Sequence, residues 1–315
     1  MKETFRCWAE IDRDALRHNA KVVRQRIGSA DMLAVVKANA YGHGLVGVAQ
    51  TLADDAQLFG VANLEEALAL RESLPHPIVI LGPATPEERS IIAQRGFTPT
   101  ISSLEEAQAF DRLGRVAINF KIDTGMGRMG VVENEAREVF KRVAALPKID
   151  IHSVSTHMPV SNEDAKFTRG QLVRFRRIIE RIRAEVPGSY RAHVLQSAGT
   201  LAFNPPTFEI VRAGIMLYGI SPLPEFQKLL KPVMTWKTRI VLVRGERCAL
   251  IGRVTMDLMM IDVSNIDNVQ VGDEVVLMGR DGSEEISCVE LAEKAGTITW
   301  EIITRIGARV RRVYV

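Results

Sequence analysis

The chain has 315 residues, of which 46% are hydrophobic and 25% are charged, a balance that excludes a disordered or fibrous protein. This length can bury one large core or two smaller ones. Lysine and arginine exceed aspartate and glutamate by only three (41 against 38) and are scattered, which excludes the focused basic patch of a nucleic-acid-binding protein, so a small-molecule partner is expected.

The N-terminal residues MKETFRCWAEIDRDAL carry charges where a signal peptide has its apolar core. No apolar run reaches the roughly 20 residues of a membrane span. We therefore expect a cytoplasmic protein that does not bind membranes. Cys7, Cys248 and Cys288 lie far apart without metal-ligand spacing, so no metal site is predicted.

Short apolar runs alternate with longer amphipathic segments through the first two thirds of the chain. The predicted strands are 32–38, 58–62, 77–82, 97–102, 116–123, 151–158, 191–198 and 208–219. Helices are predicted between them, including 63–74, 102–114 and 167–186, and Ser102 or Ser103 is the expected N-cap before Glu105 and Glu106. Eight strands with intervening helices predict an α/β fold, a (β/α)8 barrel whose active site lies at the carboxyl ends of the strands.

The sequence pattern changes after Pro222 to short alternating runs, which indicate a second, smaller β domain. The segment 221–232 contains three prolines and is the natural linker. We therefore predict a barrel domain of residues 1–222 and a C-terminal β domain of residues 223–315, with residues 1–9 as candidates to join the second domain.

Lys37 follows four apolar residues at the carboxyl end of the first predicted strand, where a barrel enzyme displays catalytic groups. A lysine at a strand end can also simply extend to water. Held against apolar walls, however, its pKa falls, and the free amine can form a Schiff base or act as a base.

The stretch LAVVKANAYGHG (33–44) resembles the pyridoxal-phosphate lysine motif of alanine racemases. The similarity continues through CWAEIDRDALRHN, KIDTGMGRMG, STHM, QSAGT, VRAGIMLYG, GRVTMD and TITWEI. This resemblance implies a pyridoxal 5'-phosphate-dependent isomerase that interconverts L-alanine and D-alanine to supply peptidoglycan precursors. It also implies a homodimer in which each C-terminal domain lies over the partner's barrel.

The resemblance assigns roles to individual residues. It implies that Lys37 holds the cofactor covalently and is one of two acid/base groups. The implied phosphate ligands are the Tyr41 hydroxyl, Ser197, the backbone N–H groups of Gly214 and Ile215, and Trp300. An aromatic residue that only packs in a turn is the alternative for Tyr41, and an ordinary βα turn is the alternative for the segment of Gly214.

The remaining assignments concern charged residues around the cofactor ring and substrate. Arg128 is implied to bind the substrate carboxylate, supported by Lys121, which is carbamylated in many relatives. His157 is expected beside the ring, and His193 is expected to orient Arg212, which faces the pyridine nitrogen and cannot give it a proton. The two histidines could instead be ordinary core residues with satisfied hydrogen bonds.

The chain departs from the family pattern in its C-terminal third. In the family, the second base is a tyrosine in a GYADGY-like motif from the partner subunit, but here KTRIVLVR (237–244) runs directly into GERCALIGRVTMDL (245–258). Met256 and Asp257, from a motif that reaches the partner's site in relatives, are present. Trp300 stands where many relatives have a tyrosine, and its indole N–H can donate a hydrogen bond but not accept one.

Three functions are consistent with these features. The first is alanine racemase, which the joint presence of Arg128, Arg212 and Met256 favours because a mere cofactor carrier needs no substrate clamp. The second is a pyridoxal-phosphate protein that lacks the second base and performs one-face proton exchange or slow transamination. The third is a catalytically silent cofactor-binding barrel.

Overall fold

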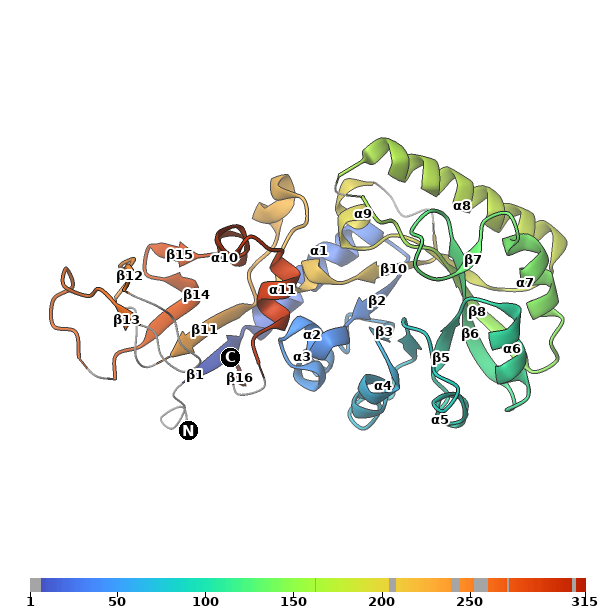
Figure 1. Cartoon of the computed structure of the whole chain (residues 1–315), viewed down its shortest axis with the longest axis horizontal. Coiled ribbons are helices and arrows are strands. Elements are labelled where there is room, and N and C mark those ends of the chain that lie inside the picture. The colour runs from blue at the N-terminus through green and yellow to red at the C-terminus, as the bar shows by residue number, and fades with distance from the viewer. Residues whose placement is uncertain are drawn as a thin grey trace.

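The computed structural model describes residues 7–161, 163–203, 208–238, 244–251, 260–270, 272–307 and 310–315. A closed parallel barrel occupies the first two thirds of the chain (Figure 1). Its strands are β2 (Asp31–Val35), β3 (Leu58–Val61), β4 (Ile78–Ile80), β5 (Thr98–Ile101), β6 (Val116–Asp123), β8 (Ile149–Ser155), β9 (Arg191–His193) and β10 (Ile210–Ala213).

Each strand pairs in parallel with the next along the chain, and β10 returns to β2 with Ile210 opposite Asp31. This closure confirms the predicted eight-stranded barrel and the order of its strands. The short strand β7 (Val131–Val132) adds to β6 outside the ring.

Helices cover the outside of the barrel. They are α1 (Arg13–Ile27), α3 (Leu45–Thr51), α4 (Leu64–Arg71), α5 (Arg89–Gln94), α6 (Leu104–Asp111), α7 (Ala136–Ala144), α8 (Ala165–Glu185) and α9 (Ser197–Ala202), with 3₁₀ helices η1 (Ile215–Tyr218) and η2 (Pro224–Leu229). In the part of the chain that is described, no helix is long and apolar enough to cross a membrane.

Helices α4 and α6 begin with the same capping arrangement. In α6, the Ser103 hydroxyl accepts from the Glu106 N–H, and the Glu106 carboxylate accepts from the Ser102 N–H at 2.6 Å, so Ser103 rather than Ser102 is the N-cap. In α4, Asn63 caps the Glu66 N–H, and the Glu66 carboxylate reaches back to the Ala62 N–H at 2.8 Å.

The C-terminal part forms a mixed five-stranded sheet in the order β15, β14, β11, β1, β16. Strand β1 (Cys7–Ile11) pairs antiparallel with β11 (Met234–Thr238) and parallel with β16 (Arg311–Tyr314). The other elements are β14 (Val275–Asp281), β15 (Glu284–Ile286), the small pair β12 (Leu250–Ile251) and β13 (Met260–Ile261), and helices α10 (Cys288–Ala295) and α11 (Thr299–Thr304). Both ends of the described chain therefore lie in this sheet.

The barrel buries apolar side chains between its strands and helices, and polar side chains inside its ring. Leu33, Phe59 and Phe120 are fully buried, and Phe120 packs edge-to-face against Phe140 of α7. Polar residues from neighbouring strands are also at most 9% exposed, and they include Thr100, Asn119, Lys121, Ser153, His193 and Arg212. Such groups are stable inside a barrel only when they bond to one another or to a ligand.

Candidate active site

A cavity of about 490 Å³ opens at the carboxyl ends of the barrel strands, the position at which barrel enzymes carry their active sites. It brings together every predicted site residue in the described part of the chain: Lys37, Tyr41, Lys121, Arg128, His157, His193, Ser197, Arg212, Gly214, Ile215 and Trp300. The other two predicted residues, Met256 and Asp257, lie outside the described residues.

Lys37 does not lie in a strand, in contrast to the predicted strand 32–38. Strand β2 ends at Val35, and Lys37 begins the short helix α2 (Lys37–Tyr41). From Ala38 to Tyr41, four consecutive non-glycine residues have φ between 52° and 54°, which makes this a left-handed turn. Such a conformation costs about 1–2 kcal/mol for each residue, so other parts of the protein must hold it.

The carboxylate of Glu66 holds the start of this left-handed turn. Besides the Ala62 N–H in the loop before its own helix, it accepts from the Ala38 N–H at 2.6 Å and the Asn39 N–H at 3.4 Å. The Asn39 side chain in turn accepts from the Leu45 N–H at 2.8 Å, at the beginning of α3. The turn thus joins the starts of two helices.

The C-terminal domain holds the other end of the turn. Arg312 donates to the Gly42 carbonyl at 2.7 Å, and the Tyr314 hydroxyl lies 2.9 Å from the His43 carbonyl. A Cβ on Gly42 would lie 2.1 Å from the Ile303 carbonyl oxygen, so only glycine allows α11 to approach this closely. The two domains therefore position Lys37 together.

The surroundings of Lys37 favour its neutral amine. Burial lowers its pKa, and the positive charges of Arg128 and Arg212 lower it further, while Glu66 acts in the opposite direction. A lysine whose pKa is lowered by burial and by neighbouring cations is a suitable nucleophile and base.

Tyr41, Ser197 and Gly214 form an anion-binding cradle on one wall of the cavity. The Ser197 oxygen accepts from the Gly214 N–H at 3.0 Å and the Met216 N–H at 3.3 Å, which leaves its own hydrogen to donate. A Cβ on Gly214 would lie 2.8 Å from the Tyr41 hydroxyl and 3.7 Å from the Ser197 hydroxyl. Glycine therefore keeps open the space beside both hydroxyls.

Arg128 follows a loop that Asp123 organises. The Asp123 carboxylate accepts from the N–H groups of Gly125 at 2.8 Å, Met126 at 2.7 Å and Gly127 at 2.8 Å. Burial acts to raise the Asp123 pKa, but these bonds and the Arg128 N–H outweigh it and leave the pKa lowered. Arg128 itself is exposed at the cavity mouth.

Arg212 is 6% exposed and is held by a ring of acceptors. Its Nη1 lies 2.7 Å from His193 Nδ1 and 3.0 Å from the His193 carbonyl oxygen. Its Nη2 donates to the carbonyls of Thr156 at 2.8 Å and Val194 at 2.9 Å, and lies 3.3 Å from His157 Nδ1. Among the described residues these contacts account for the Nη hydrogens, which leaves the Nε–H for an acceptor in the cavity.

Both histidines beside Arg212 are neutral. Burial and then the Arg212 charge lower the pKa of His157 to about 2 and hold the pKa of His193 well below its usual range. Burial also lowers the pKa of Arg212 to about 10, which still leaves it a cation at neutral pH. His193 Nδ1 lies 2.7 Å from Arg212 Nη1, the contact that its expected role of orienting Arg212 requires.

The charge of the cavity identifies the kind of molecule that it suits. Its lining contains Lys37, Lys121, Arg128 and Arg212, and no aspartate or glutamate among the described residues that line it. A ligand with several negative groups would offset this excess of basic groups. Pyridoxal 5'-phosphate fits, because its phosphate suits the Tyr41–Ser197 cradle and its aldehyde suits the neutral Lys37 amine.

Sequence reasoning missed the residues that position the predicted ones, chiefly Glu66 and Asp123. Local signals for both exist. Glu66 follows Asn63 at capping-box spacing, and Asp123 precedes a Gly-Met-Gly segment typical of a turn bonded to an aspartate side chain. Those signals predict local bonds, whereas the contact between Glu66 and the Lys37 turn joins two separate βα units.

Comparison with known proteins finds similarity over nearly the whole chain. The family model "Alanine racemase, N-terminal domain" matches residues 11–222, and "Alanine racemase, C-terminal domain" matches residues 231–314. The alanine racemase of Halothermothrix orenii is 36% identical, with 98% of this chain and 96% of that protein covered. Their alignment spans 367 positions, more than the 315 residues of this chain, so it includes gaps on this chain's side.

Solved structures are similar over nearly the whole chain. The alanine racemase of Clostridium difficile 630 has a TM-score of 0.93 at 29% identity, with 99% of this chain and 96% of that chain covered. The alanine racemase of Bartonella henselae, whose structure contains covalently bound pyridoxal phosphate, has a TM-score of 0.87 at 24% identity, with 99% and 100% covered. At that identity the second similarity concerns the fold.

Proposed function

The chain belongs to the alanine racemase family, and from this premise we propose that it racemises alanine with pyridoxal 5'-phosphate held at the carboxyl end of its barrel. The observation that carries the proposal is the convergence of the predicted residues on one cavity. We further propose that it acts in the cytoplasm to supply D-alanine for peptidoglycan precursors.

When bound, pyridoxal phosphate withdraws electrons from the α-carbon of an amino acid and so makes its α-proton acidic. We propose that Lys37 anchors the cofactor and that its neutral amine takes or returns this proton on one face. Tyr41, Ser197, Ile215 and Trp300 would bind the phosphate, and Gly214, whose N–H donates to the Ser197 oxygen, would leave room for it. A fixed phosphate holds the cofactor in one orientation toward the lysine.

We propose that one arginine contacts the cofactor ring and the other binds the substrate. Arg212 would donate its Nε–H to the pyridine nitrogen, and because a guanidinium keeps its proton, that nitrogen would stay unprotonated. Arg128 would pair with the substrate carboxylate through its planar fork. His157 would lie beside the ring, and His193 would orient Arg212.

Lys121 has the further role of supporting Arg128. It is 9% exposed, and burial, followed by the charges of Arg212 and Arg128, lowers its pKa well below the usual value. A neutral amine can add carbon dioxide to form a carbamate, an anion that would pair with a guanidinium. We propose this modification here, as in the family.

The second base is the point at which this chain differs from the family pattern. Of its four tyrosines, all in described positions, Tyr41 alone lines the cavity. We propose that the segment bearing the partner's tyrosine is missing between Arg244 and Gly245, where the sequence joins two parts of a longer family motif. This observation favours the second candidate function, proton exchange on one face.

We also propose a homodimer, in which Met256 and Asp257 reach the partner's cavity. A shortened C-terminal domain would weaken that interface and expose strand edges. Measurement of the molecular mass in solution at micromolar concentration, beside activity, tests this. A strictly monomeric chain with full activity would contradict a shared site.

The deciding experiment compares inversion of alanine with exchange of its α-hydrogen. The chain is incubated with each α-deuterated enantiomer, and deuterium loss and inversion are followed separately. With Lys37 as the sole base, deuterium should wash out of one enantiomer, while inversion falls by about 10² to 10⁴ relative to exchange, the usual contribution of a general acid–base group.

A grafted variant serves as the control. A GYADGY-bearing segment inserted between Arg244 and Gly245 should restore inversion if its loss is the only defect. Equal rates of inversion and exchange in the unmodified chain would show a full racemase with another second base. The absence of both reactions, with cofactor bound, would favour a silent carrier.

A further inference from the structure

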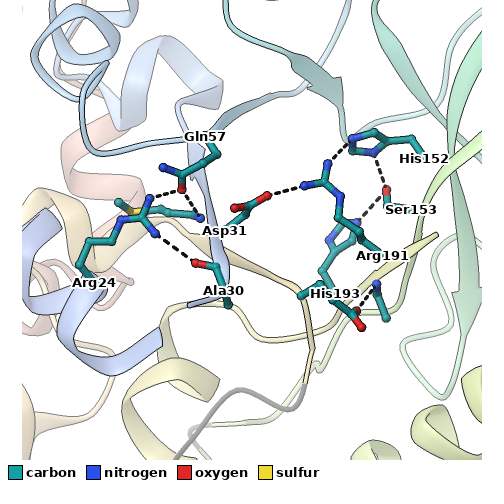
Figure 2. A network of polar contacts seen from close by, with 11 residues as sticks. Arg24, Ala30, Asp31, Gln57, His152, Ser153, Arg191 and His193 are labelled. Carbon is teal, nitrogen blue, oxygen red and sulfur yellow. Dashed lines mark hydrogen bonds and ion pairs between the residues drawn. The ribbon is translucent and has the colours of Figure 1, made fainter. Parts of the chain in front are cut away.

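A continuous polar network crosses the barrel interior from the amino ends of its strands to Arg212. Figure 2 shows Asp31, Arg191, His152, Ser153 and His193 in succession. Asp31 and Arg191 form an ion pair at the starts of β2 and β9, with side chains 33% and 32% exposed. At the other end of the network, Ser153 and His193 are at most 1% exposed.

The direction of every hydrogen bond in this network follows from the chemistry of its two ends. Arginine can only donate, so Arg191 donates to His152 Nε2, and that nitrogen must carry a lone pair. Neutral His152 therefore holds its proton on Nδ1, which donates to the Ser153 oxygen at 3.2 Å. By the same reasoning Arg212 donates to His193 Nδ1 at 2.7 Å, so neutral His193 holds its proton on Nε2.

Asn119 connects the two halves and has only one allowed orientation. The Thr100 hydroxyl donates to the Ile80 carbonyl at 2.7 Å, so its oxygen needs a donor and receives one from Asn119 Nδ2 at 3.0 Å. Asn119 Oδ1 then accepts from the Ser153 hydroxyl at 3.0 Å and from His193 Nε2 at 3.0 Å. The Ser153 oxygen lies 3.3 Å from the same His193 nitrogen.

These directions exclude proton transport through the barrel. The protons of both histidines point toward the centre, where Asn119 Oδ1 only accepts and has no proton to pass on. The network therefore does not move protons. Its effect is to fix which ring nitrogen of His152 and of His193 carries the proton. A second proton on His193 would place an N–H against the Arg212 guanidinium at 2.7 Å, with two positive charges in contact.

We propose that Asn119, Ser153, His152 and Arg191 are positioning residues that hold His193 neutral and protonated on Nε2, so that Arg212 keeps its Nε–H directed into the cavity. The effect on the pyridine nitrogen rests on the proposed function. The protonation states themselves do not, because they follow from this chain's own contacts.

The first test uses cofactor-free protein labelled with ¹⁵N at histidine, whose ring nitrogens report directly where the proton lies. The chain has six histidines, and the variants His152→Gln and His193→Gln assign the two signals. We expect opposite neutral tautomers, with His152 protonated on Nδ1 and His193 on Nε2, and no titration of His193 over about pH 5 to 8. The same tautomer in both histidines, or a charged His193, would overturn the proposal.

Arg191→Met removes the hydrogen-bond donor that fixes the tautomer of His152. His152 should then move its proton to Nε2, the form that free histidine prefers, and Arg191→Lys should reverse the change by restoring a donor. Arg115→Met is the matched control, because Arg115 pairs with Asp150 near the start of β8 without touching the network, and it should change neither signal. If Arg191→Met and Arg115→Met give the same spectra, the proposal is wrong.

Asn119→Asp provides a second, nearly isosteric variant should Arg191→Met fail to fold. A carboxylate against Nε2 should let His193 take up a second proton and titrate within about pH 5 to 8. An unchanged, neutral His193 in this variant would contradict the proposal.

Kinetics of the cofactor-loaded protein separate positioning from stability. In Arg191→Met, kcat for α-hydrogen exchange should fall about three- to tenfold, the effect of one weakened hydrogen bond, while KM changes little because Arg128 is untouched. Equal kcat in Arg191→Met and Arg115→Met would refute the coupling to Arg212 and leave the proposed function intact. Failure of the wild-type chain to act on alanine would refute the function, while the ¹⁵N spectra would still decide the positioning claim.

Discussion

Replacement of Glu66 by alanine should loosen the left-handed turn that carries Lys37. Glu106 offers a matched control, since both glutamates occupy the third position of a capped helix and accept from the preceding loop. Only Glu66 also accepts from Ala38 and Asn39. Glu106→Ala therefore removes a helix cap, whereas Glu66→Ala removes a helix cap and the support of the turn.

The magnitude follows from these contacts. Loss of the capping interaction costs about 1 kcal/mol in either variant. The additional bonds to the turn are made by a charged acceptor and contribute about 1.5–3 kcal/mol. Without them Ala38 and Asn39 can relax, and the release of about 1–2 kcal/mol of strain at each of these two residues offsets most of that loss. The free energy of unfolding should therefore fall by similar amounts in both variants, and the difference should appear when the cofactor is bound.

A relaxed turn must be rebuilt before Lys37 can react. The apparent affinity for pyridoxal phosphate should fall about 10- to 100-fold in Glu66→Ala and stay near the wild-type value in Glu106→Ala. Titration of the cofactor-free proteins, followed by absorbance, measures this. Thermal unfolding of the same samples checks that the two variants lose similar stability.

Glu66 also affects the charge of Lys37. Because its carboxylate acts to raise the Lys37 pKa, its removal should lower that pKa further, and the midpoint for chemical acylation of Lys37 should move to lower pH. Equal cofactor affinity in Glu66→Ala and Glu106→Ala would refute the claim that Glu66 holds the turn. A shift of the acylation midpoint to higher pH would refute the electrostatic part.

Three further predictions concern the same cavity. Borohydride reduction of the cofactor-loaded protein should label Lys37, and Lys37→Ala should abolish the label; labelling of another lysine would show that the anchor is elsewhere. Gly214→Ala should weaken phosphate binding because its Cβ would lie 2.8 Å from the Tyr41 hydroxyl, and the loss in the double variant with Tyr41→Phe should be smaller than the sum of the two single losses, whereas purely additive losses would contradict a steric cause. The Asp123 pKa lies below its unfolded value of about 3.9, so the stability it contributes is present above about pH 4 and is lost as the pH falls through the folded pKa. The difference in stability between wild type and Asp123→Asn should accordingly shrink in acid, and a difference independent of pH would count against this role.

The sequence by itself determines the barrel and the residue types at its mouth. Buried parallel strands need continuous apolar runs, and eight such runs, separated by amphipathic segments, leave few alternatives to a closed (β/α)8 ring. In that ring the strand ends meet at one mouth, which is the position expected for Lys37. The resemblance to alanine racemases adds Lys121, His157, His193 and Arg212, and all five residues line the cavity.

Tertiary structure alone decides how those residues are held. Nothing local predicts a left-handed turn at Ala38–Tyr41, since no residue there is glycine and the conformation is unfavourable for each of them. It exists because Glu66 accepts its N–H groups from another βα unit and because Arg312 and Tyr314 bond to the loop that follows, about 270 positions away in the chain. The tautomers of His152 and His193 likewise depend on Arg191 from β9 and Arg212 from β10. A histidine's own neighbours in sequence do not determine which nitrogen carries its proton.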